Sequence, residues 1–242
     1  MPTPKLTSRL KNDNWALHQI AERQPTPGSL IKGTMPIDDY KAVLIQQTLL
    51  NTELDQALAS ARTSNPTLEA LISEDEYLTP YLLEDLAHFD LSADDAQPTP
   101  GVQRFIDHIS AHKDQPWHLL GLHYVRLGAC NGNTFVARVV RKAFGLNATD
   151  GTRYLDPFGK AQRKGWTTFK AGIDALDIDQ AAQDAIFTGT RAAYVQTINL
   201  DFDVYKDANT LLAEHGKSLD KAEFDEHHSV HITKEMHAKL DN

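Results

Sequence analysis

The feature that most constrains the fold is a long apolar segment over residues 117–144, in which the hydrophobic residues follow helical spacing. Gly145 comes directly after it, and glycine is the residue most often found just past the last turn of a helix. Elsewhere the chain has no sustained alternation of apolar and polar residues with hairpin turn signals. The sequence therefore predicts an all-α fold, a multi-helix bundle that needs no strands.

Clusters of proline and glycine divide the rest of the chain. Pro25-Thr26-Pro27-Gly28 is typical of a helix stop, and residues 93–101 form the clearest loop. Gly216-Lys217-Ser218 precedes a charged final segment, so we expect one helical domain over residues 1–216 and a charged helical extension over 217–242. The predicted helices cover residues 6–23, 35–60, 68–89 with an interruption near Thr79-Pro80, 102–111, 117–144, 157–176 and 178–215.

Composition excludes several classes of function. The net charge of −9 argues against a general nucleic-acid or anionic-membrane surface, since contacts to phosphates need clustered Lys and Arg. The chain has no apolar run of about 20 residues and no apolar stretch near its start that resembles a secretory signal. A single cysteine, Cys130, rules out an internal disulfide framework. These observations predict a cytoplasmic protein with no nucleic-acid partner and no membrane insertion.

The helix expected over residues 6–23 places Lys11, His18 and Glu22 on one face, because they are seven and four residues apart. Seven helical residues span about 10.5 Å. A neutral imidazole is a common ligand for iron, and a porphyrin carries two carboxylates at one edge that need cationic partners. His18 and Lys11 are thus spaced to hold an iron porphyrin, although an ordinary half-buried histidine on an amphipathic helix has the same pattern.

Two glycines, Gly128 and Gly132, lie four residues apart inside the longest predicted helix. Each glycine in the interior of a helix lowers the stability of that helix by about 1 kcal/mol relative to alanine, so we expect the pair to serve a purpose. The sequence allows two explanations. The helix backbone can approach a flat ligand closely where side chains are missing, or the glycines can allow close packing against another helix.

The segment His18-Gln19-Ile20-Ala21-Glu22 resembles the proximal helix of heme oxygenases, which place their axial histidine first in a His-x-x-Ala-Glu pattern. The match continues through Lys32-Gly33 and Tyr40-Lys41. The resemblance implies a heme oxygenase-like helical bundle in which His18 is the ligand to the metal. It also implies that Glu22 belongs to the heme-binding set and that Lys11 binds a propionate.

Gly128 and Gly132 align with the glycine pair of the distal helix in heme oxygenases, and Lys170 lies where the family has a second cation for the propionates. The resemblance implies that heme is both cofactor and substrate. It would be cleaved with O2 and reductant to biliverdin, CO and iron, with electrons from a donor such as ferredoxin or a flavoprotein reductase. Gly128, Gly132 and Asn131 would then form the distal catalytic wall.

Two positions depart from the family pattern. Ala129 stands where the distal helix usually has an aspartate that holds the proton-delivering waters, and Asp174 stands where an arginine usually assists the propionates. Amides at Asn131, Asn133 or Asn51 could hold replacement waters, but none can act as a general acid. The departures leave two alternatives: a heme-binding or heme-delivery protein that lacks turnover, or an unrelated activity with a decayed heme site.

Other candidate constellations are weaker. His227 and His231 have the i, i+4 spacing of helical metal ligands but lie in a charged terminal segment, where solvation or adventitious metal binding is the simpler interpretation. A di-iron centre would need repeated acidic and histidine ligands on facing helices, and Glu53, His88 and His123 are isolated. Cys130 in an apolar helix favours an inert packed thiol.

Overall fold

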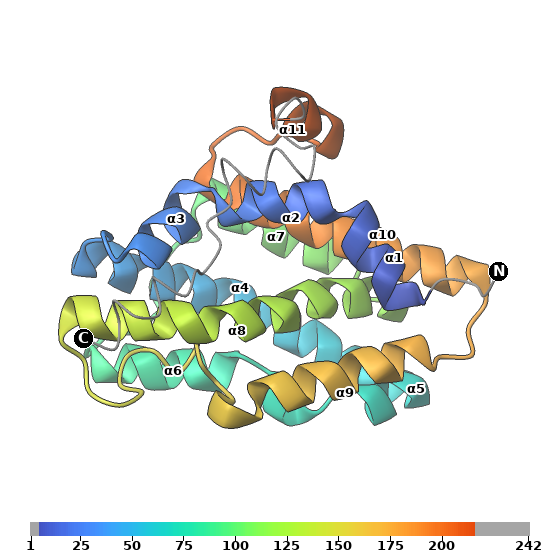
Figure 1. Cartoon of the computed structure of the whole chain (residues 1–242), viewed down its shortest axis with the longest axis horizontal. Helices are drawn as coiled ribbons and strands as arrows, with labels where there is room; N and C mark the ends of the chain where they lie inside the picture. Colours follow the sequence, from blue (N-terminus) through green and yellow to red (C-terminus); the bar gives the residue numbers. More distant parts are fainter. Residues whose placement is uncertain (1–4, 216–242) are drawn as a thin grey trace.

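The computed structural model describes residues 5–215, and within this range it contains α-helices and short 3-10 helices but no strands (Figure 1). The predicted all-α fold is confirmed for these residues. The predicted extension over 217–242, with its histidines, lies outside the described residues.

Eleven α-helices and three 3-10 helices make up the described part of the chain. The α-helices are α1 (Leu6–Asp13), α2 (Trp15–Glu22), α3 (Pro25–Lys32), α4 (Ile37–Ser64), α5 (Pro66–Leu71), α6 (Thr79–His88), α7 (Pro100–Ala111), α8 (Pro116–Phe144), α9 (Gln162–Asp174), α10 (Gln180–Ile198) and α11 (Ala208–His215). The 3-10 helices are η1 (Glu74–Glu76), η2 (Gly159–Ala161) and η3 (Asn199–Asp201).

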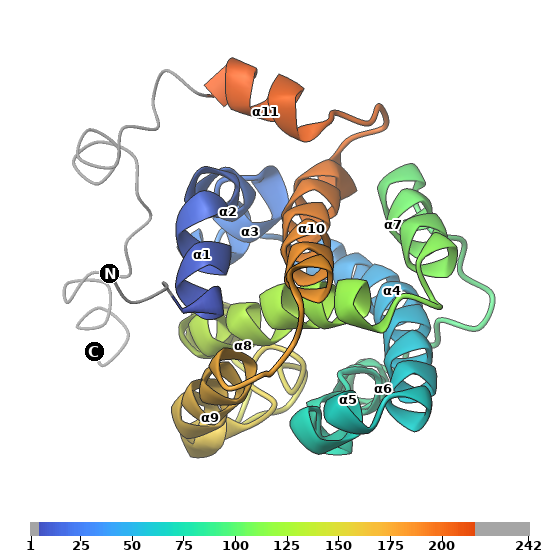
Figure 2. The same ribbon diagram turned by 90° about the vertical axis from the view of Figure 1, so that its right-hand side faces the viewer.

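Helix α8 runs through the middle of the bundle, and α10 crosses over it (Figure 2). The crossing is close because both helices have glycine at the contact. A Cβ on Gly121 would collide with the backbone of Ile186 and Thr190, and a Cβ on Gly189 would collide with the backbone of His118. Any larger residue at either position would push the two helices apart.

The apolar core follows α8 on both sides of this crossing. One cluster joins α8 to α4, α7, α9 and α10, and a second joins α8 to α3, α4 and α6. A third, smaller cluster packs α2 against α10 and α11, so α2 is held mainly by α10. Fully buried members of the three clusters include Leu58, Leu119, Leu120, Ile186, Tyr40, Leu44, Leu82, Leu17, Ile20 and Ile198.

The central helix agrees with the sequence prediction. Helix α8 covers Pro116–Phe144 without interruption, and Gly145 after it has the left-handed φ of 67° that closes a helix end. Helix α4 extends to Ser64, a turn further than expected. Cys130 is buried, as expected for a packed thiol, and burial raises its pKa to about 12.

The N-terminal prediction needs two corrections. The single helix expected over residues 6–23 is divided at Asn14, whose side-chain amide donates a hydrogen bond to the Leu10 carbonyl at 2.9 Å. Such side-chain bonds compete with the helical ladder. The helical segment ends at Glu22, as predicted, but the proline cluster after it is not a loop, because Pro25 starts α3. Proline is compatible with the first turn of a helix, where its missing N–H would have no helical partner.

The same property of proline explains two further differences between the predicted and the observed helices. The break in the predicted helix over 68–89 lies before Thr79, and Pro80 belongs to the first turn of α6. Pro100, expected to be in a loop, is the first residue of α7. In each case the proline marks where a helix begins.

The helix expected over residues 178–215 is broken between α10 and α11. The Asn199 side chain donates to the Lys206 carbonyl at 2.8 Å and accepts from the Lys206 N–H at 2.7 Å, which closes a compact loop. Asp207 then accepts bonds from the N–H groups of Asn209 and Thr210 and opens α11.

The described helices include none that is both long enough and apolar enough to cross a lipid bilayer.

The α8–α10 crossing yields a stability prediction. Gly189→Ala places a methyl group against the His118 carbonyl, and we expect it to lower the free energy of unfolding by about 3 kcal/mol. Gly165→Ala is the matched control, because a Cβ there meets no other group within 4 Å and alanine favours the helix by up to about 1 kcal/mol. Urea unfolding followed by circular dichroism measures both. Equal effects in the two variants would contradict a steric role for Gly189.

Candidate functional site

His18 lies half-buried on α2, beside the apolar residues that pack this helix against α10. Its side chain is 36% exposed, whereas Leu17 and Ile20 are almost fully buried. The imidazole stacks on Trp15 with ring centroids 5.2 Å apart and meets the edge of Tyr194 from α10 at 5.7 Å. These two aromatic rings limit the orientations that the imidazole can take.

The two nitrogens of His18 have different surroundings. Nε2 lies 3.6 Å from Oε1 of Glu22, one turn further along α2, while Nδ1 is buried and has no hydrogen-bond partner among the described residues. A histidine that binds a metal commonly uses one nitrogen as the ligand and the other to contact a carboxylate or carbonyl. His18 thus has a carboxylate beside one nitrogen and no hydrogen-bond partner in residues 5–215 at the other.

Lys11 contacts the same tryptophan that stacks on His18. Its ammonium group is 5.5 Å from the centre of the Trp15 ring, in a cation–π contact. The Trp15 indole nitrogen is buried and, within residues 5–215, makes no hydrogen bond. Trp15 thus connects the two residues of α1 and α2 that the sequence placed in one site.

The two glycines of α8 differ in their surroundings. A Cβ on Gly128 would lie 3.3 Å from the Trp166 ring of α9, whereas a Cβ on Gly132 would meet nothing within 4 Å among the described residues. Neither glycine is where helix backbones approach closely, because that role belongs to Gly121 and Gly189. At Gly128 the missing side chain leaves room for Trp166 of α9, in agreement with close packing, whereas at Gly132 it leaves the helix surface open.

Lys170 has a contact similar to that of Lys11. Its ammonium group is 5.2 Å from the centre of the Trp166 ring, which in turn borders Gly128. Each of the two lysines therefore lies over a tryptophan that belongs to one side of the candidate site. Trp15 and Trp166 were not singled out in the sequence, where a tryptophan four residues from each lysine was the available signal.

Asp174 holds α1 and α9 together. Its carboxylate accepts hydrogen bonds from the Thr7 N–H and the Thr7 hydroxyl, both at 2.9 Å, and lies 3.9 Å from Lys5 Nζ. The two helices run in opposite directions (Figure 1), and Lys11 lies four residues after Thr7 on α1 while Lys170 lies four residues before Asp174 on α9. Asp174 is therefore part of the bond that sets the two lysines in register.

A buried polar network anchors the opposite side of α8. Arg126 forms an ion pair with Asp55 of α4, and both side chains are 9% exposed. Asp55 also accepts bonds from the backbone and hydroxyl of Thr79 at 2.8 and 2.6 Å. Arg126 and Asp55 connect α8 to α4 and to the start of α6, which restrains the distal segment near Gly128.

His123 extends this network. Burial lowers the pKa of His123, so the imidazole is neutral near pH 7. Its Nδ1 accepts from Arg126 at 3.0 Å, and its Nε2 donates to Glu76 at 2.9 Å. His123 is thus fully engaged and is not available as a metal ligand.

The exposed face of α8 carries the residues expected to form the distal wall. Ala129, Asn131 and Gly132 are exposed and Asn133 is half-buried. Asn51, in contrast, is buried, donates to the Gln47 carbonyl at 2.8 Å and accepts from Arg126 at 3.4 Å. Asn51 therefore belongs to the buried network and not to the exposed face of α8.

The described residues contain one group of metal-ligand side chains with neighbouring ligand atoms, and it is away from this site. The group is His108, His112 and His118, which the sequence analysis missed. The sequence pattern that could have identified this group is three histidines at positions i, i+4 and i+10. Glu53, His88 and His123 do not form such a group, so the structure gives no support to a di-iron centre.

Comparisons with known proteins agree with the resemblance. The family model described as heme oxygenase matches residues 4–201. A heme oxygenase from Pyropia yezoensis is 24% identical over 156 residues, which cover 62% of this chain and 65% of that protein. The match thus spans just under two thirds of the length of this relative.

Solved structures show the same fold. The structure of heme oxygenase from Leptospira interrogans matches with a TM-score of 0.75 at 20% identity, over 83% of this chain and 100% of that one. The crystal structure of heme oxygenase-2 from Synechocystis sp. PCC 6803, in complex with heme and NO, matches with a TM-score of 0.74 at 20% identity. That match covers 92% of this chain and 91% of the other.

The buried ion pair yields the second prediction. Asp55→Asn leaves the Arg126 guanidinium buried without its counter-charge, and we expect the free energy of unfolding to fall by about 3–5 kcal/mol. Asp13→Asn is the matched control, because the Arg9–Asp13 pair is exposed and such pairs contribute about 0–1 kcal/mol. Chemical denaturation compares the two variants. A loss below 1 kcal/mol in Asp55→Asn would mean that the network does not anchor α8.

Proposed function

Because this chain belongs to the heme oxygenase family, we propose that it binds heme with His18 as the axial ligand to the iron. The observation that carries the proposal is the pair of environments at His18, with Glu22 beside one nitrogen and the other nitrogen buried without a partner in the described chain. Glu22 would hold the orientation and tautomer of the imidazole.

The remaining residues of the site divide between the carboxylates and the faces of the ligand. Lys11 and Lys170 follow the Thr7–Asp174 junction on the same side, so they would pair with the propionates at one edge. Gly128 and Gly132 would let a flat ring approach the backbone of α8. Trp15 and Trp166 would hold the lysine stems and exclude water.

For the activity we propose oxidative cleavage of heme to biliverdin, CO and iron. Heme would be both cofactor and substrate, supplying the iron at which O2 reacts and the ring that is opened. Electrons would come from an external donor such as ferredoxin or a flavoprotein reductase. The contribution of this chain is to orient His18, neutralise the propionates and organise water on the exposed face of α8.

Proton delivery is the step with least support from these residues. The methyl group of Ala129 cannot hold a water or donate a proton. Asn131, two residues further along and exposed, can order a water through its amide but cannot act as a general acid. Ala129 thus favours the second candidate function, a heme-binding or heme-delivery protein with little turnover.

The axial-ligand assignment is tested by titration with hemin. We expect the unmodified protein to bind one hemin and shift its Soret band. His18→Ala should weaken binding at least about tenfold and give a changed Soret band that added imidazole restores. His88→Ala is the control, since His88 is exposed on α6. An unchanged Soret band in His18→Ala would show that His18 is not the axial ligand, and absence of a Soret shift in the unmodified protein would overturn both heme functions.

Turnover distinguishes the two candidate functions. With ascorbate or reduced ferredoxin under air, Ala129→Asp should form biliverdin and CO at least about tenfold faster than the parent, because it adds an ionisable group to hold water. Ala129→Asn, which cannot ionise, should change the rate much less. Equal rates in all three would show that another group organises the waters. Tight hemin binding with no biliverdin or CO from the parent would favour heme delivery.

A further inference from the structure

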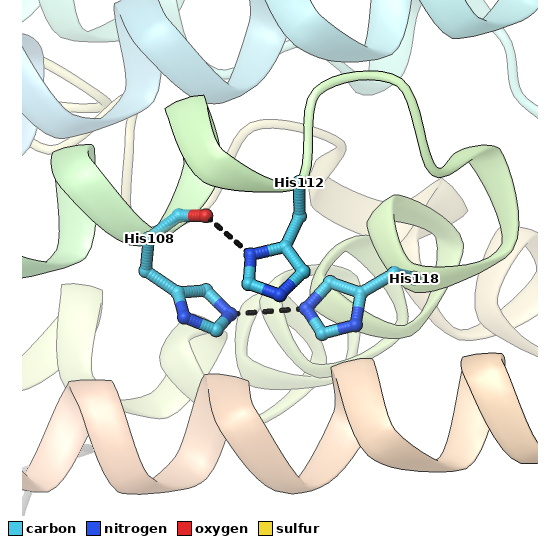
Figure 3. Close-up of side chains that lie close together, drawn as sticks. All are labelled: His108, His112 and His118. Atoms are coloured by element: carbon cyan, nitrogen blue, oxygen red, sulfur yellow. Dashed lines mark hydrogen bonds between the residues drawn. The ribbon is translucent and has the colours of Figure 1, made fainter.

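Three histidines meet where α7 ends and α8 begins (Figure 3). His108 lies in the last turn of α7, His112 is the residue that ends this helix, and His118 lies in the first turn of α8. One ring nitrogen from each lies within 4.8 Å of the others. The His112 and His118 rings are stacked, with centroids 4.2 Å apart and planes at 14°.

The hydrogen bond of His112 shows which of its two ring nitrogens carries the proton and which carries the lone pair. Its Nδ1 lies 2.8 Å from the His108 carbonyl oxygen, which can only accept, so Nδ1 carries the proton. In a neutral ring the lone pair is then on Nε2. This nitrogen is free to act as a ligand while Nδ1–H holds the ring in place, an arrangement typical of metal-binding histidines.

The other two rings face each other through Nε2 atoms 3.0 Å apart. Without a metal ion, one of these nitrogens must donate to the other. Burial lowers the pKa of both His108 and His118 to about 4, so both are neutral at pH 7. Neutral imidazoles can ligate a metal without first losing charge, and a shift of the proton to Nδ1 would turn both Nε2 lone pairs toward it.

The position of His118 is fixed by the fold. It is 3% exposed, and its carbonyl lies where α8 and α10 cross, against Gly189. The turn between His112 and α8 is closed by a bond from the Gln115 N–H to the His112 carbonyl at 2.9 Å. His108 and His112 are only half-buried. The cluster is therefore rigid on one side and open to solvent on the other.

We propose that His108, His112 and His118 form a binding site for a divalent first-row transition metal of the Zn²⁺ class, with one position left for water or an exogenous ligand. Imidazole ligands suit such ions. Zn–N bonds of about 2.0–2.1 Å in a tetrahedral site place ligand nitrogens about 3.3 Å apart. The observed separations, 3.0 Å for one pair and at most 4.8 Å for the group, need only small ring movements to reach this value.

The site is separate from the proposed heme site and does not depend on it. His118 is ten residues before Gly128 on the same helix, a separation of about 15 Å along α8. A metal ion here would join the end of α7 to the start of α8. It would therefore stabilise the folded chain and raise its Tm.

The test is Zn²⁺ titration by calorimetry on the full-length, heme-free chain. The starting protein carries His227, His228, His231 and His237 changed to alanine, so that terminal histidines do not compete. We expect one Zn²⁺ per chain and a higher Tm with Zn²⁺. His112→Ala, at a half-buried helix end, should weaken binding at least tenfold and abolish the Tm shift, while exposed His88→Ala should change neither.

Co²⁺ provides a spectroscopic check on the ligands. The starting protein should show the d–d absorption of a four-coordinate imidazole site, and His112→Ala should lose it while its far-ultraviolet circular dichroism stays unchanged. Absence of Zn²⁺ binding in the starting protein, or equal binding in His112→Ala and His88→Ala, would overturn the proposal. Hemin binding is measured separately, so failure of the heme site and failure of this site give different results.

Discussion

The close crossing of α8 and α10 is the constraint on which the rest of the bundle depends. Gly121 and Gly189 let the two backbones touch, and the apolar clusters form around this contact. Helix α10 in turn holds α2 and places Tyr194 against His18. The same crossing fixes His118 at the start of α8. The absence of side chains at Gly121 and Gly189 thus helps to set the positions of both the proposed heme ligand and the proposed metal ligand.

Polar contacts fix the positions of the helices around the α8–α10 crossing. The Arg126–Asp55 pair and the His123–Glu76 bond anchor α8 from the side opposite its exposed face, and Asp174 joins α1 to α9 through Thr7. Buried charges cost desolvation energy, so these groups are stabilising only because each has its partner. Their common effect is to hold both sides of the candidate site while leaving the surface at Gly132 open.

Much of the fold could be predicted from local pattern. The central helix and its end at Gly145 followed from apolar spacing and glycine chemistry, and the all-α class followed from the lack of alternation. The errors were at prolines and asparagines. Pro25 and Pro100 begin helices, while Asn14 and Asn199 break them through side-chain bonds to backbone groups. The local sequence around a proline is compatible with either the end or the start of a helix, and the packing of the chain decides which of the two occurs.

Helical spacing and motif order are local properties, so the sequence alone was enough to predict the helical class, the likeness to heme oxygenases and the candidate set of His18, Lys11, Gly128, Gly132 and Lys170. How residues far apart in the chain are used followed only from the packing of the helices. It assigned Asn51 and Asp174 to structural bonds and brought His118 to His108 and His112. Such contacts depend on how helices cross, and the spacing of residues along one helix carries no information about the crossing.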